Sequence, residues 1–260
     1  MDLIKNADSL YEEYEALLLE RDQLEKEIGR IWTAYQQLFG KLISDVYEEK
    51  TECIKCQKII AYYQNALNHG GIVDSAAMED YLEKEMRVYY ANLDQMLKEN
   101  EAANEADPPT PNEVQQAKTL YRRLAKWIHP DIYPETDSSD ELKELWERIL
   151  TAYHHNDVKE LSELEVLIQR ALKELGSDET RIDVQDIEEK IDELKNEINS
   201  IIHAEPYVLR YYLDYEDAAE RKTAELKAEL ESYQKYHKEL AAMILQMLQC
   251  GGLMIHVDIE

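Results

Sequence analysis

Apolar residues recur at alternating spacings of three and four over roughly the first seventy positions of the chain. This spacing is typical of the seam of a coiled coil. The seam residues form two runs: Leu10, Tyr14, Leu17, Leu24, Ile28, Ile31, Tyr35, Leu38 and Leu42, then Val46, Cys53, Cys56, Ile60, Tyr63 and Leu67. The runs join through successive spacings of four, a stutter that locally unwinds a supercoil without ending it. We therefore predict a helix over about residues 10–67, ended by Gly70–Gly71.

A second helix is predicted to follow this glycine pair. Asp74 or Ser75 can serve as its N-cap, and its apolar positions continue to Asn100. Beyond that residue the chain becomes acidic and rich in proline through residues 101–111, a composition typical of a linker.

Another seam with three-four spacing occupies the C-terminal part of the chain. It starts at Val184, is interrupted at residues 204–206 and resumes from Tyr212 to Met247. Gly251–Gly252 is predicted to end the last helix, and a strand is one option for the tail that follows. The simplest arrangement is an antiparallel coiled coil of N-terminal against C-terminal helices. The same periodicity equally allows a coil between two copies, which would make a homodimer.

The composition favours long helices. Charged residues make up 33% of the chain, whereas it has only 7 glycines and 6 prolines. The formal net charge of −27 argues against a nucleic-acid partner, since phosphate binding depends on cationic neutralisation. No apolar run is long enough for a membrane span and no signal peptide is recognisable, so we expect a cytoplasmic protein with no membrane partner.

One basic helix interrupts this acidic chain. From Val114 to Pro130 there is no acid, and the bases there are Lys118, Arg122, Arg123 and Lys126. Leu124 and Ile128 belong to an apolar stripe on the same helix. Because the residue before a proline is pushed away from helical dihedrals, the helix should end at Pro130 and present His129 and Asp131 outward at a corner.

A basic helix that reads Tyr-Arg-Arg-Leu-Ala-Lys and is followed, after two residues, by His-Pro-Asp resembles helix II and the loop of a DnaJ-like J domain. Residues 140–153 resemble its helix III, and 158–175 would form the last helix. Asn112 is the expected N-cap of the basic helix. The short first helix of a J domain has no good counterpart. The helix ending near Asn100 might serve, the element might be missing, or the coiled coil might complete the core.

The resemblance implies a co-chaperone that docks on a DnaK-type ATPase chaperone and stimulates ATP hydrolysis by that partner. The implied partner-binding residues are His129, Pro130, Asp131, Lys118, Arg122, Arg123 and Lys126. The alternative is an ordinary turn beside a solvated charged face. On that interpretation the protein is a coiled-coil scaffold with a degenerate J-like module.

Other chemistry is weakly supported. Cys53 and Cys56 lie in the apolar seam and lack the second ligand pair that zinc needs. His154 and His155 are neighbours on a helix and do not share a face. His237 is expected to be a packed or register-setting polar residue of the last seam. We predict no catalytic residue, cofactor or metal, and therefore no enzyme.

The predicted protein is all-α, with a small J-like domain at the tip of a long coiled coil. This plan resembles bacterial J-domain proteins with coiled-coil flanks, whose arms could hold a client protein. The predicted segments are 1–70 (N-terminal helix), 71–111 (helix and linker), 112–176 (J-like domain), 177–250 (C-terminal helices) and 251–260 (tail). The predicted core of the J-like domain comprises Tyr121, Leu124, Ile128, Trp146, Ile149 and Tyr153.

Overall fold

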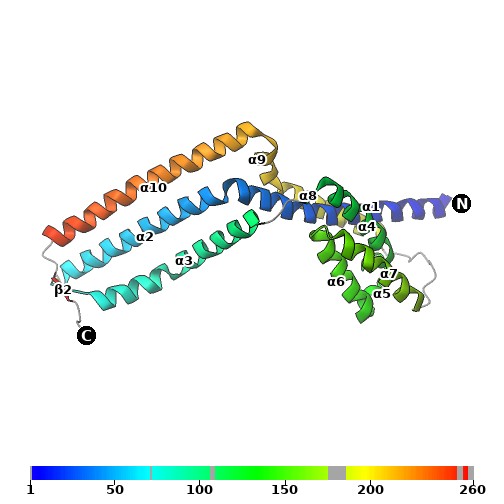
Figure 1. The fold of residues 1–260 in the computed structure, drawn as a ribbon, viewed down its shortest axis with the longest axis horizontal. Coiled ribbons are helices and arrows are strands. Elements are labelled where there is room, and N and C mark those ends of the chain that lie inside the picture. Colours follow the sequence, from blue (N-terminus) through cyan, green and yellow to red (C-terminus); the bar gives the residue numbers. More distant parts are fainter. Residues whose placement is uncertain (1, 71, 106–108, 175–185, 251–253, 257–260) are drawn as a thin grey trace. The chain divides into compact units, whose positions relative to one another are not determined.

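A computed structural model describes residues 2–70, 72–105, 109–174, 186–250 and 254–256. The chain forms two compact units, each described here by itself. Unit 1 comprises Met1–Arg30 and Asp107–Val208, and unit 2 comprises Ile31–Ala106 and Leu209–Glu260. The described residues are almost entirely helical, which confirms the all-α class (Figure 1). The predicted turn at Gly176, the seam start at Val184 and the stop at Gly251–Gly252 lie outside the described residues.

Unit 1 consists of helices packed around the basic segment. They are the part of α1 (Asp2–Tyr35) up to Arg30, α4 (Pro111–Ile128), α5 (Glu135–Ser138), α6 (Asp140–His154), α7 (Val158–Glu174) and α8 (Ile187–His203), and the unit ends within the 3₁₀ turn η2 (Tyr207–Leu209). Helix α4 is the predicted basic helix. Its N-cap is Thr110 rather than Asn112, because Thr110 and Glu113 form a reciprocal capping box and Pro111 occupies the first helical position.

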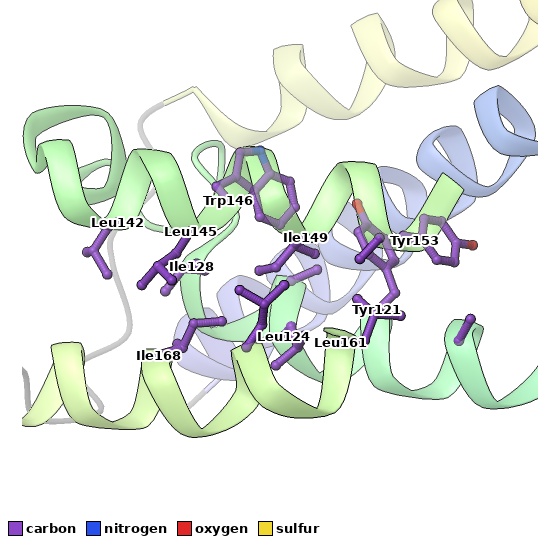
Figure 2. Packing of buried hydrophobic residues seen from close by; sticks show 14 of the residues in the cluster. Tyr121, Leu124, Ile128, Leu142, Leu145, Trp146, Ile149, Tyr153, Leu161 and Ile168 are labelled. Atoms are coloured by element: carbon purple, nitrogen blue, oxygen red, sulfur yellow. The ribbon is translucent and has the colours of Figure 1, made fainter. Parts of the chain in front are cut away.

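The core of unit 1 lies between α4, α6 and α7 (Figure 2). Tyr121 stacks on Tyr153 with ring centroids 3.9 Å apart, whereas His129 meets Trp146 at 4.7 Å. The order of these contacts is reversed along the two helices, so α4 and α6 run antiparallel. All six predicted core residues are buried, and α7 adds three that are fully enclosed: Leu161, Leu164 and Ile168.

Helix α1 contributes to this core. Leu19 of α1 belongs to the same buried cluster as α4 and α6. A second cluster joins Tyr14 and Leu18 of α1 to Ile132 of the loop and to α8. Of the predicted alternatives for completing the core around α4 and α6, the one found is packing by the long N-terminal helix. The helix that passes Asn100 belongs to unit 2 and does not take this place.

Unit 2 continues the long N-terminal helix and adds two long helices and a short one. After Tyr35 the chain passes through a π-helical turn at Gln36–Gly40, next to the predicted stutter, and enters α2 (Lys41–Asn68). The other elements are β1 (Ile72–Asp74), α3 (Ser75–Glu105), α9 (Arg210–Asp214), α10 (Glu216–Cys250) and β2 (Met254–His256). The Asp74 carboxylate accepts a hydrogen bond from the Ala77 N–H, which confirms the predicted cap.

The predicted antiparallel packing is wrong for unit 2. The strands that follow α2 and α10 pair in parallel, with Ile72 opposite Met254, so both helices end on the same side (Figure 1). Side-chain order agrees, because Cys53 contacts the Tyr233 carbonyl oxygen and Gln57 contacts Tyr236. Period-3.5 patterns place an apolar face on each helix but carry no information about direction. Antiparallel packing is instead found between α2 and its sequence neighbour α3 (Figure 1).

Candidate partner-binding corner

The corner that follows α4 is formed by local interactions around Pro130. The His129 N–H donates to the Ala125 carbonyl, and the next residue, Pro130, has no N–H with which to extend the helix. The Thr136 hydroxyl then donates to the buried Ile128 carbonyl at 2.9 Å and satisfies one of the free carbonyls at the helix end. The backbone path through the corner is therefore fixed locally.

His129 is not presented to solvent. Only 3% of this residue is exposed, so the prediction that it points outward is wrong for this structure. Its Nδ1 accepts a hydrogen bond from the Asp131 N–H at 3.1 Å, which leaves the ring proton on Nε2. Nε2 lies 3.4 Å from an Asp22 carboxylate oxygen of α1. The imidazole is thus held on both sides by the protein's own groups.

Asp22 is the residue that sequence analysis missed. Its carboxylate accepts a 2.6 Å hydrogen bond from the Tyr121 hydroxyl and pairs with Arg21 at 2.9 Å. Burial alone would raise the pKa of Asp22, but hydrogen bonds from His129 and Tyr121, with the charge of Arg21, outweigh it and leave the pKa below its ordinary value. The sequence showed only that Arg21 is the one missing seam position, and nothing there distinguished Asp22 from the other acids.

Asp131 is the more accessible end of the corner, with 46% of its side chain exposed. Its carboxylate lies 3.5 Å from the Arg21 guanidinium, which also lies 3.9 Å from Glu197 of α8. Ile132 anchors the following residue in the cluster between α1 and α8. A carboxylate such as that of Asp131 is suited to bind an arginine. The arginine found there is Arg21 of the same chain and not one from a partner.

The four predicted bases of α4 divide into two pairs. Arg123 is bound to Glu165 of α7 at 2.9 Å, and Lys126 is bound to Glu15 of α1 at 2.5 Å. Within the described part of the chain, Lys118 and Arg122 form no ion pair. The two bases of α4 nearest the corner, Arg123 and Lys126, are therefore paired within the chain. The two bases nearer the start of α4, Lys118 and Arg122, are not.

The remaining polar candidates belong to other elements of the two units. Cys53 and Cys56 are buried and free in the helical packing of unit 2, as predicted. His237 is bound to Glu49 at 2.6 Å, which fits the predicted packed polar position. His154 and His155 end α6, and the residues that the structure describes contain no group of three potential metal ligands.

No family model, curated protein or solved structure matches this chain. Among the described helices, none combines the length and apolar character that a membrane crossing demands. The corner must therefore be interpreted from its own geometry.

Proposed function

We propose that the protein is a J-type co-chaperone that binds a DnaK-type ATPase chaperone through the His129–Pro130–Asp131 corner and stimulates its ATPase. The observation that carries this proposal is the place of the corner, at the joint between two antiparallel packed helices, one of which is basic. The helical arms would act as a scaffold or hold a client. The resemblance to a J domain suggests the partner, and the position of the corner beside a basic helix supports docking there.

A partner can bind His129 only if α1 moves away from the corner. The imidazole is buried against Asp22, and Arg21 occupies the Asp131 carboxylate that a partner arginine would bind. On this proposal, the structure is a covered form in which α1 competes with the chaperone for the same two side chains. A ligand shifts such an equilibrium only by its differential affinity for the uncovered form. Weakening the Asp22 contact should therefore increase stimulation of the chaperone.

A second function is favoured by the same burial. If α1 never leaves the corner, the J-like module is a packed structural element and the protein is a helical scaffold. The internal ion pairs of Arg123 and Lys126 also support this alternative, because they remove charge that a partner would need.

Single-turnover ATP hydrolysis by a DnaK-type chaperone distinguishes the two functions. We expect stimulation by the wild-type chain, greater stimulation by Asp22→Asn, and none by His129→Gln. His155→Gln is the matched control, since it makes the same change at an exposed imidazole of the same unit. Circular dichroism must show that each variant folds. A chaperone that responds to neither the wild type nor Asp22→Asn would overturn the proposal and leave the scaffold.

A further inference from the structure

Four bases of unit 1 lie together without carboxylate partners. Lys26 and Arg30 come from α1, and Lys118 and Arg122 come from α4. Among the described residues, none of the four takes part in an ion pair, although acids outnumber bases by 56 to 29 in this chain. Several other described bases, such as Lys50 and Arg87, also form no ion pair, so what sets this group apart is that Lys26, Arg30 and Lys118 line one cavity.

Three of these bases line a small cavity of about 130 Å³, whereas Arg122 lies outside its lining. Its lining consists of Gln23, Lys26, Glu27, Arg30, Val114, Lys118 and Tyr153. Lys26 is only 6% exposed. Its amine lies 3.7 Å from the centre of the Tyr153 ring and donates to Asn156 at 2.6 Å. A buried ammonium is thus held in place by a ring face and an amide, and neither carries a negative charge.

The electrostatics of the cavity favour an added negative charge. Burial, followed by the nearby Arg30, lowers the pKa of Lys26 to about 8. Burial, followed by Arg122, likewise lowers the pKa of Lys118, and Glu27 only partly opposes this. The Lys26 amine is therefore buried beside a second cation, and Lys118 lies next to another cation with only partial compensation from Glu27. An anion between them would relieve the repulsion and gain charge-assisted hydrogen bonds.

We propose that the Lys26–Arg30–Lys118 cavity binds a phosphoryl-type oxyanion, either free phosphate or a phosphomonoester. Lysine and arginine are suited to this group as a point charge and a planar fork of donors. The cavity lies well below the ~300 Å³ at which sites for larger organic ligands begin, so the bound portion is the phosphoryl group itself. The site does not include His129, and it would exist whether or not the corner binds a chaperone.

Calorimetric titration of the full chain with inorganic phosphate, in chloride buffer of constant ionic strength, tests the site. We expect saturable binding that weakens about tenfold in Arg30→Gln and further in the double variant with Lys118→Gln, because each loses a charge-assisted hydrogen bond. Glu27→Gln should bind several-fold more tightly, since it removes the one acid in the lining. Lys126→Gln is the matched control: this base is paired with Glu15 and should leave binding unchanged.

Glycerol phosphate provides a second arm of the titration. Tighter binding of this ester than of free phosphate would indicate an esterified ligand, and the reverse would indicate phosphate itself. Nuclear magnetic resonance of labelled lysines gives an independent readout, because bound anion should raise the pKa of Lys26 from about 8. An unmoved Lys26 pKa, no heat beyond dilution, or equal binding by the double variant would overturn the proposal. Normal phosphate binding by His129→Gln would separate this site from the proposed co-chaperone function.

Discussion

The core of unit 1 and the α2–α10 packing of unit 2 come from similar apolar periodicities but differ in how completely they enclose their residues. In unit 1, Leu124, Ile149 and Leu164 are fully buried, because α1, α4, α6 and α7 surround one another. In unit 2, α2 lies between α3 and α10 (Figure 1), and the flanking helices leave large apolar side chains such as Met243 and Leu245 exposed. Periodicity therefore predicts a buried face but not the number of helices that cover it.

The largest test of this difference is the removal of one leucine from each unit. Leu124→Ala should cost about 3–4 kcal/mol of unfolding free energy, because a fully enclosed cavity cannot collapse easily. Leu240→Ala should cost about 2 kcal/mol, since α10 can shift toward α2. Hydrogen exchange of amides assigned to each unit measures the two losses separately. Equal losses would show that the two packings are equivalent.

A second pair compares buried and half-exposed carboxylates. Asp22→Asn should cost about 2 kcal/mol, because it removes a buried charge that His129, Tyr121 and Arg21 all contact. Glu49→Gln, which weakens the contact with His237 in unit 2, should cost less than about 1 kcal/mol. Urea unfolding at neutral pH measures both changes.

The pH dependence of stability provides a control for the comparison of the wild type with Asp22→Asn. The folded pKa of Asp22 lies below its ordinary value of 3.8, so its contribution is present above about that pH and is lost as pH falls through the folded pKa. The gap in stability between the wild type and Asp22→Asn should therefore close in acid. A gap that stays constant from neutral pH to below the folded pKa would mean that the charge of Asp22 contributes nothing.

Loss of a helix cap should cost about the same free energy of unfolding in both units. Thr110→Ala removes the capping box of α4, and Asp74→Ala removes the cap of α3. We expect each change to cost about 1 kcal/mol, because the lost hydrogen bond is local and exposed. Hydrogen exchange in the first turn of each helix reports the effect. A several-fold larger effect in either helix would show that its cap supports more than its first turn.

A separate pH test concerns Lys26. Its folded pKa of about 8 lies below the ordinary 10.5, so the unfolded chain binds more protons between these values. The stability of the wild type relative to Lys26→Met should therefore rise as pH increases from 8 to 10.5. Paired thermal unfolding across this range measures the difference. A flat difference would indicate that Lys26 is solvated like a surface lysine.

Much of the fold follows from local signals. The helices predicted at 10–67 and before Met247, the cap at Asp74 and the end of the basic helix at Ile128 each depend on residues close in sequence, and the structure agrees with them, although Tyr212 lies in the separate short helix α9. The direction of packing and the number of covering helices could not be predicted. Helical periodicity is the same in both directions, so it carries no information about the parallel course of α10 beside α2.

The candidate site was predictable only in part. The corner residues and the core beneath them follow from the α4 and α6 patterns. The covering of the corner by α1 could not be predicted, because the contact between Asp22 and His129 joins positions more than a hundred residues apart. A single carboxylate on a charged helix, among 56 acids, carries no mark of such a role. The unpaired state of Lys26 is similarly invisible until α1 and α4 are placed together.

The parallel pairing of α2 with α10 has a consequence for synthesis on the ribosome. The chain of α2 emerges more than 150 residues before the segment that covers Cys53 and Ile60, so that face must wait for α10. The buried cluster of α4, α6 and α7 draws on α1, which is already made when these helices appear. Unit 1 can therefore assemble its core during translation, while the apolar side of α2 remains uncovered until nearly the whole chain has left the tunnel.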